Sequence, residues 1–507
     1  MLLTILNNFL LNIVSIFIIL ISVCGTGLIL NNFFKIGFKL EKLFFFGILI
    51  KIILIFFINL FFSLNFFVNF FLILFGFYLF LINLNKIKKN NNFNFLLLIP
   101  LTALISIRDG FLFDNFLYHI PLINLAIENN LVLGQSNINF RFGTPTLIYG
   151  IYSSFYLPIL KYNSVFLLNS VFFIFVLKFF LDQNREKKTL STYTIIILTL
   201  FLFFDALLHP LPLGLFIGRL GTPEYDLLVG LLHIYTIFYI VKNIINKKIK
   251  NNFYILILIL LTIFIKPTIF PIFLIFIWLL ILQKNYIVIM LKTFPIQYCL
   301  LIIFFAIFLV KSFLNTGCFY PYFSITCQNV SWYSSENINN LTLASLSWKG
   351  YTTNVSSFFD FSWINYWLKS YFLSTIFFIY FLILILINFL LFFVSTKSYQ
   401  NKYLEYEIWK KILIFHLISI LLWILSSPDL RFVWSTFLII SSILILNILI
   451  KLNLIERFFN LLNLSKKFNI YLILLLIILC IKNLYFVDYQ SLSKKYLVEE
   501  NYYKKKN

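Results

Sequence analysis

Long apolar runs, separated by short polar segments, repeat along almost the whole chain. About fourteen such runs can be recognised, and most of them approach the ~20 apolar residues that a helix needs to cross a membrane. They cover residues 3–30, 43–62, 66–83, 94–107, 164–181, 191–208, 226–242, 252–265, 268–283, 293–312, 371–394, 411–426, 432–451 and 468–486.

These runs predict helices. In lipid, every backbone N–H and C=O group must find its partner inside the protein, which only helices and closed barrels achieve. None of the runs alternates apolar and polar residues as a barrel strand does. We therefore expect an all-α, polytopic transmembrane protein with about 14 spans. Without internal repeats or a sizeable soluble domain, the chain forms one transmembrane unit of N-terminal helices (1–93), a core (94–435), and C-terminal helices with a basic tail (436–507).

The composition agrees with a membrane protein. Hydrophobic residues make up 61% of the 507 residues and charged residues 11%, whereas soluble domains average roughly 45–50% and 25%. A globular core cannot bury that much apolar side chain. The N-terminus lacks a charged segment and a small-residue cleavage site, so the first run is predicted to be a retained helix and not a signal peptide.

The net charge of +22 indicates orientation in the membrane and not a nucleic-acid partner, because the basic residues lie in short segments between apolar runs. One side of the predicted topology holds 25 of the 40 basic residues and only 6 of the 18 acidic ones. Cytoplasmic loops carry an excess of Lys and Arg, so this side is predicted to be cytoplasmic and both termini to lie outside. The predicted outer loops are 108–162, 209–225, 313–370 and 427–431.

Acidic residues beside a membrane are costly, and a cluster of them suggests function. Asp109 and Asp114 follow the run at 94–107, and Tyr118 and His119 come directly after them. In a helix that begins at 114, Asp114 and Tyr118 share a face. Asp114 also suits a helix N-cap, and the spacing does not decide between catalysis and capping. The segment that follows, up to Leu133, is expected to lie in the membrane interface.

Other outer segments carry further charged residues, and each has an ordinary structural alternative. Glu224 and Asp226 could simply cap the helix at 226, and Lys266 could extend toward the lipid headgroups. Arg431 could pair with Asp429, two residues away, or bind lipid phosphate. The candidate site residues outside the first cluster are Arg141, Arg219, Glu224, Asp226, Lys266 and Arg431.

Histidine and cysteine positions argue against a zinc site. No two histidines have metal-ligand spacing, and His209 and His233 are interpreted as isolated structural residues. Cys318 and Cys327 lie in a predicted outer loop, where oxidation is permitted, and are predicted to form a disulfide.

Together these motifs resemble the GT-C superfamily, whose members are multi-pass glycosyltransferases that use lipid-phosphate-linked sugars. The resemblance is closest to a bacterial branch with that architecture and covers residues 94–435. It rests on the acid after an early span, the Tyr118-His119 pair, the Arg141-Phe142-Gly143 segment, and the segments 222–226, 266–267, 317–332 and 428–432. One departure is Asn115, which stands where the superfamily usually has a second acid.

The resemblance implies an enzyme with a GT-C-like core and outer juxtamembrane helices. Asp114 would match the acid that acts as general base or binds a divalent cation, with Asp109 as the substitute. Lys266 and Arg431 would match cations that hold the donor phosphate. Tyr118, His119, Arg141, Arg219, Glu224 and Asp226 would support these groups or contact the acceptor. The partners would be membrane lipids and a lipid-linked sugar donor, in a bacterial plasma membrane.

Three other functions remain open at this point. A polysaccharide polymerase or ligase also has many spans and a large outer loop, but it would be expected to use arginines there, and residues 313–370 contain none. A transporter usually has paired broken helices with charges at mid-membrane. A non-catalytic scaffold fits the same pattern of spans.

Overall fold

The computed structural model confirms an all-α protein, and no strand occurs in the part of the chain that it describes. The described residues are 2–34, 37–91, 93–107, 115–160, 162–186, 194–198, 220–245, 252–266, 295–345, 404–426 and 433–452, with scattered positions at 272–278, 386–387 and 454–481.

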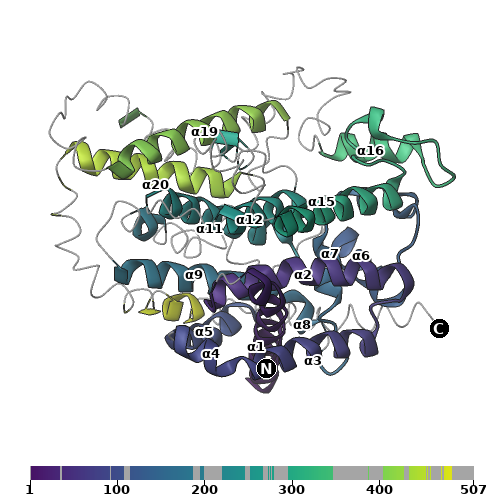
Figure 1. The fold of residues 1–507 in the computed structure, drawn as a ribbon, viewed down its shortest axis with the longest axis horizontal. Helices are drawn as coiled ribbons and strands as arrows, with labels where there is room; N and C mark the ends of the chain where they lie inside the picture. Colours follow the sequence, from purple (N-terminus) through teal and green to yellow (C-terminus); the bar gives the residue numbers. More distant parts are fainter. Residues whose placement is uncertain are drawn as a thin grey trace.

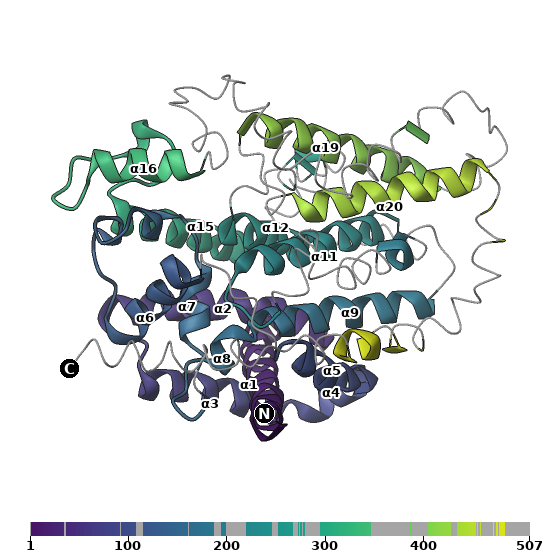
Figure 2. The ribbon, with the colours of Figure 1, turned by 180° about the vertical axis from the view of Figure 1, so that it is seen from behind.

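Most of the long helices lie side by side along the longest axis of the molecule, with α19 and α20 at the edge opposite α3 (Figures 1 and 2). This arrangement follows from their composition, because helices that are apolar on all sides can be buried in each other and in lipid. The long helices are α1 (Leu2–Phe34), α2 (Leu40–Phe61), α3 (Phe66–Ile82), α9 (Leu168–Glu186), α11 (Tyr225–Ile245), α12 (Asn252–Ile265), α15 (Pro295–Thr316), α19 (Leu404–Ser426) and α20 (Trp434–Lys451).

Six helices among the described residues are long and apolar enough to cross a membrane. The number becomes seven if α3 and the short α4 (Leu84–Asn90), which meet at a bend of 65°, count as one span. The protein is therefore a multi-pass integral membrane protein, and the count of about 14 spans stays a prediction. The run at 94–107 forms only η1 (Phe93–Leu97) and α5 (Leu98–Ile105), which are too short to span on their own.

Glycine allows α1, α2 and α3 to pack unusually closely. A Cβ atom at Gly47 of α2 would overlap the backbone carbonyl of Val23 in α1, and one at Gly76 of α3 would overlap that of Ser22. Small residues have this role in membranes, where helix association depends on close packing.

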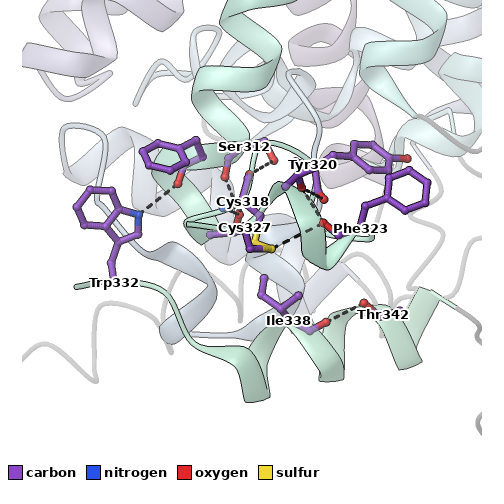
Figure 3. The surroundings of a disulfide bond; sticks show 11 residues. Ser312, Cys318, Tyr320, Phe323, Cys327, Trp332, Ile338 and Thr342 are labelled. Atoms are coloured by element: carbon purple, nitrogen blue, oxygen red, sulfur yellow. Dashed lines mark hydrogen bonds between the residues drawn. A yellow bond between two sulfur atoms is a disulfide. The ribbon is translucent and has the colours of Figure 1, made fainter. Parts of the chain in front are cut away.

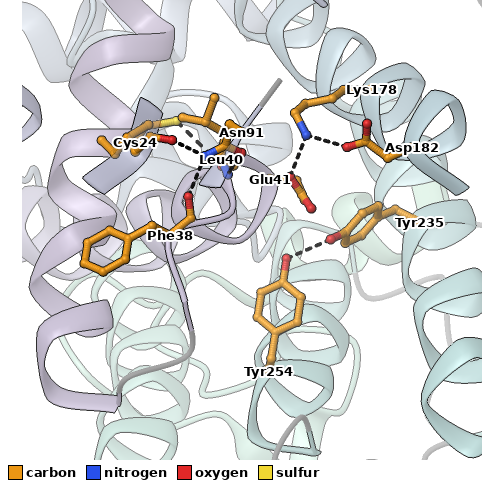
Figure 4. A network of polar contacts seen from close by, with 10 residues as sticks. Cys24, Phe38, Leu40, Glu41, Asn91, Lys178, Asp182, Tyr235 and Tyr254 are labelled. Carbon is orange, nitrogen blue, oxygen red and sulfur yellow. Dashed lines mark hydrogen bonds and ion pairs between the residues drawn. The ribbon is translucent and has the colours of Figure 1, made fainter. Parts of the chain in front are cut away.

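Segments that the charge pattern assigned to one side lie together in the structure. Lys178 of α9 forms ion pairs with Glu41 of α2, at 3.1 Å, and with Asp182 of α9, at 2.6 Å (Figure 4). Asn91 donates to the backbone carbonyl of Phe38 close by. All these residues belong to the end of the bundle that is predicted to be cytoplasmic.

The predicted outer loop 108–162 is only partly a surface loop. It forms η2 (Asn115–His119), α6 (Ile120–Glu128), η3 (Gln135–Asn137), η4 (Phe140–Gly143) and α7 (Ile148–Ser153), which is followed by α8 (Asn163–Phe166). The α7 segment is buried among the helices, and the amide of Leu147 just before it donates to the carbonyl of Phe264 in α12. Its apolar residues explain why this part of the loop folds inward.

A small lobe follows α15 and contains the disulfide bond between Cys318 and Cys327 (Figure 3). The chain turns out of α15 at Gly317, whose φ of +81° is a conformation that favours glycine. The lobe continues through η7 (Ser324–Thr326) to α16 (Ser335–Ser345). It packs on the earlier outer segment, since the side chain of Asn137 donates to the carbonyl of Trp332 at 2.9 Å.

Candidate functional site

Five polar or aromatic residues from four separate segments meet at the end of the bundle that carries the disulfide lobe. They are the outer-end cluster: His119 at the end of η2, Tyr149 in α7, Tyr225 and Asp226 at the start of α11, and Lys266 just after α12.

His119 is fixed by contacts on several sides and is only 4% exposed. Its Nδ1 atom lies 2.8 Å from the hydroxyl of Tyr149, and its ring packs against those of Tyr118 and Tyr225, with centroids 4.2 and 5.5 Å away. Burial raises the pKa of the Tyr149 hydroxyl well above its usual value, and the nearby Tyr225 adds to this increase. Tyr149 therefore keeps its proton at neutral pH, and it also shares a hydrogen bond with Tyr225.

The segment that carries His119 does not begin as the ordinary α-helix that the sequence suggested. Residues Asn115–His119 form a π-helical turn, and α6 starts at Ile120. A π turn bonds residue i to i+5, whereas an α-helix bonds i to i+4. Asp114, which would share a face with Tyr118 in an α-helix, lies outside the described residues. Such turns occur frequently at functional sites.

Lys266 and Asp226 form an ion pair, and their side chains are 8% and 14% exposed. The Lys266 ammonium also lies 5.7 Å from the centre of the Tyr225 ring. Trp434, at the start of α20, donates from its indole nitrogen to the backbone carbonyl of Asp226 at 3.3 Å. Thus Lys266 is largely buried and paired inside the protein, and Asp226 contacts both Lys266 and Trp434.

Glu224 is buried in the structure, with 2% of its surface exposed, and is not a solvated cap of α11. Its backbone carbonyl accepts a hydrogen bond from Asn169 of α9 at 2.7 Å. Asn169 in turn accepts one from the Tyr152 hydroxyl at 2.8 Å. This network fixes the turn that leads into Tyr225 and Asp226.

Arg141 adds a second positive charge beside the cluster. Its guanidinium carbon lies 5.2 Å from the centre of the Tyr118 ring, at a distance typical of a cation–π contact. The segment that carries Arg141 is held by the disulfide lobe, because a Cβ atom at Gly143 would lie within 3.2 Å of side-chain atoms of both Thr316 and Leu341.

Four predicted site residues lie outside the described part of the chain: Asp109, Asp114, Arg219 and Arg431. Their neighbours in sequence are described. Asn115, directly after Asp114, is 5% exposed, and Leu220, directly after Arg219, accepts a hydrogen bond from Ser170 at 2.9 Å. Trp434, three residues after Arg431, contacts the cluster as described above.

The described residues do not provide a complete metal site. No group of three or more His, Cys, Asp or Glu side chains in this part of the chain is arranged to hold a metal ion.

A family model described as a domain of unknown function (DUF8201) matches residues 9–438. The chain belongs to this family. No curated protein and no solved structure matches it. The DUF8201 match includes the whole outer-end cluster and Trp434.

Several polar residues of this DUF8201 protein were not recognised as partners in the sequence. His233 is not isolated: its ring is parallel to that of His416 in α19, with the centroids 5.3 Å apart, and its Nδ1 lies 2.9 Å from the Ser435 hydroxyl. Lys51, in the middle of α2, is 1% exposed and lies over the Phe155 ring at 4.9 Å. No local sequence pattern signals such contacts, because the partners are far apart in the chain.

Proposed function

We propose that this protein is a membrane glycosyltransferase of the GT-C type. It would move a sugar from a polyprenyl-phosphate donor to a cell-surface glycan or lipid on the non-cytoplasmic face of a bacterial plasma membrane. The observation that carries the proposal is the outer-end cluster, in which His119, Asp226 and Lys266 meet beside Arg141 at one end of the helix bundle.

The charges of the cluster suit a reaction in which phosphate leaves a sugar. The transition state gains negative charge on the leaving phosphate, and fixed cations in a poorly hydrated site stabilise that charge strongly. Lys266 provides one such cation and Arg141 another, while Arg431 offers a planar fork for two phosphate oxygens. The tyrosines around His119 provide ring faces and hydroxyl groups for a sugar.

The reaction also needs a group that accepts the proton of the acceptor hydroxyl. We assign this role to Asp114, with Asp109 as the substitute, because Asp114 directly precedes the π turn that ends at His119. General-base catalysis commonly contributes about 10²–10⁴-fold to the rate.

Asp114→Asn should therefore abolish glycosyl transfer and leave folding intact, because Asn caps a helix about as well as Asp. The assay is transfer by the purified protein from a panel of polyprenyl-phosphate sugars, with Asp182→Asn at the opposite end of the bundle as a control that should stay active. Near-normal transfer by Asp114→Asn would move the base to Asp109 or Glu224. Absence of transfer from every donor by the wild-type protein would argue against the function.

One observation favours a transporter as the second candidate. Lys51 is buried in the middle of a span, and ionisable residues at that depth commonly mark transport paths. Uptake of a charged solute by reconstituted vesicles, lost in Lys51→Met, would support that function instead.

A further inference from the structure

Lys266, a cation that the proposed reaction requires, already forms an ion pair with an acid of the same site. Lys266 is paired with Asp226, and both side chains are largely buried. The Tyr225 ring lies on one side of the Lys266 ammonium. Asp226 is itself held in place, since the Trp434 indole binds its backbone carbonyl and the Trp434 ring packs on Gly230, one turn further along α11. An anion that approaches Lys266 must therefore meet a carboxylate.

We propose that the donor phosphate displaces Asp226 from Lys266, and that the released carboxylate then binds a hydroxyl group of the acceptor. The inference rests on the proposed function, because it takes the donor phosphate as the incoming anion. Two anions on one buried ammonium repel each other with little screening from salt. The donor phosphate is a diester with one negative charge, and it gains a second negative charge as the sugar leaves, so it then takes the place of the carboxylate beside Lys266.

The neighbours of Asp226 suit this exchange. Next to it, Tyr225 shares a hydrogen bond with Tyr149, and Tyr149 contacts His119. A carboxylate released from Lys266 thus stands at the end of a row of hydroxyl and imidazole groups, which is a polar surface suited to sugar hydroxyls. Asp226 cannot hold an acceptor hydroxyl strongly while it is neutralised by Lys266, so the acceptor gains this contact only through the exchange.

Farnesyl phosphate is a short polyprenyl phosphate with the monoester group that remains after the sugar has left. Its binding to the full-length protein in phosphatidylcholine nanodiscs tests the exchange. Asp226→Asn removes the competing charge and should tighten binding by about tenfold or more, the size by which a neighbouring charge commonly shifts an ionic equilibrium. Lys266→Met should weaken binding by a similar factor. Asp226→Glu, which keeps the charge, and Asp182→Asn, which removes a charge at the other end of the bundle, should both bind as the wild type does. Farnesol, which lacks the phosphate, should bind all variants equally.

The possible results separate the exchange from the function. The exchange is supported if Asp226→Asn binds farnesyl phosphate more tightly than the wild type while Asp226→Glu and Asp182→Asn do not. Asp226→Ser gives the same comparison if the Asn variant does not fold. Unchanged or weaker binding by these variants, while Lys266→Met loses affinity, overturns the exchange and leaves the proposed function in place. Equal binding of farnesyl phosphate and farnesol by the wild type overturns both. Inorganic phosphate that competes as well as farnesyl phosphate would show a site for free phosphate and would likewise overturn both.

Discussion

Replacement of Lys178 should destabilise the fold strongly, because this residue neutralises a buried acid. Its ammonium lies 3.1 Å from Glu41 and 2.6 Å from Asp182 (Figure 4). The side chains of Lys178 and Glu41 are 4% and 7% exposed, whereas that of Asp182 is 32% exposed. Lys178→Met would leave the Glu41 carboxylate buried without its cation, while Asp182 can still be hydrated.

The expected size of the effect follows from this difference in burial. Removal of one partner from a buried ion pair costs about 3–5 kcal/mol, whereas an i, i+4 pair on a helix surface contributes about 0.3–0.5 kcal/mol. We expect Lys178→Met to lower the free energy of unfolding by about 3 kcal/mol or more, and Asp182→Asn by less than about 1 kcal/mol. The double variant Glu41→Gln with Lys178→Met should lose less than Lys178→Met alone, because no unpaired charge stays buried.

Reversible unfolding in detergent micelles, followed by tryptophan fluorescence, measures all four proteins under the same conditions. The comparison between Lys178→Met and Asp182→Asn controls for the loss of one charge at this end of the bundle. Equal losses in these two variants would refute the reasoning, as would a double variant no more stable than Lys178→Met.

Two further predictions concern Lys51 and the topology. The Lys51 ammonium has no hydrogen-bond partner among the described residues. Lys51→Met should therefore raise the free energy of unfolding by about 1–3 kcal/mol in the same assay. A loss of stability would show that the charge is compensated. Cysteines placed at Ile138 and Ile325, which are 60% and 91% exposed, should react with a membrane-impermeant thiol reagent in intact cells, whereas one at Lys89 should not; the reverse pattern would invert the predicted orientation.

The positions of the helices could be predicted from the sequence, because lipid requires long apolar stretches and these stand out in composition. The runs at 43–62 and 432–451 correspond to α2 (Leu40–Phe61) and α20 (Trp434–Lys451) within a few residues. Errors occurred where a segment is apolar but short. Residues 148–153 were placed in an outer loop, yet they form α7 inside the bundle, since six residues do not produce a recognisable run.

It was harder to predict which residues form the site than where the helices lie. The sequence indicated His119, Asp226 and Lys266 individually, because charged and polar residues at helix ends stand out against an apolar chain. It did not indicate Tyr149, since tyrosine is common in this chain, or the pairing of Lys266 with Asp226, since forty residues separate them. The structural alternatives considered for these residues were headgroup contact for Lys266 and helix capping for Asp226, and neither included an ion pair between the two.

The lateral arrangement of the helices explains why such pairings escape sequence analysis. Charge is costly in lipid, so most charged residues lie near the two ends of the bundle, with Lys51 as an exception, and their depth can be predicted from the apolar runs. Their neighbours depend on which helices approach each other, and here that depends on single glycines. A Cβ atom at Gly230 would overlap the Trp434 indole, and one at Gly221 would lie 2.5 Å from the carbonyl oxygen of Ser106. Gly230 lets α20 approach α11, and Gly221 lets the end of α5 approach the segment just before α11. The geometry around Asp226 therefore depends on residues that carry no chemistry of their own.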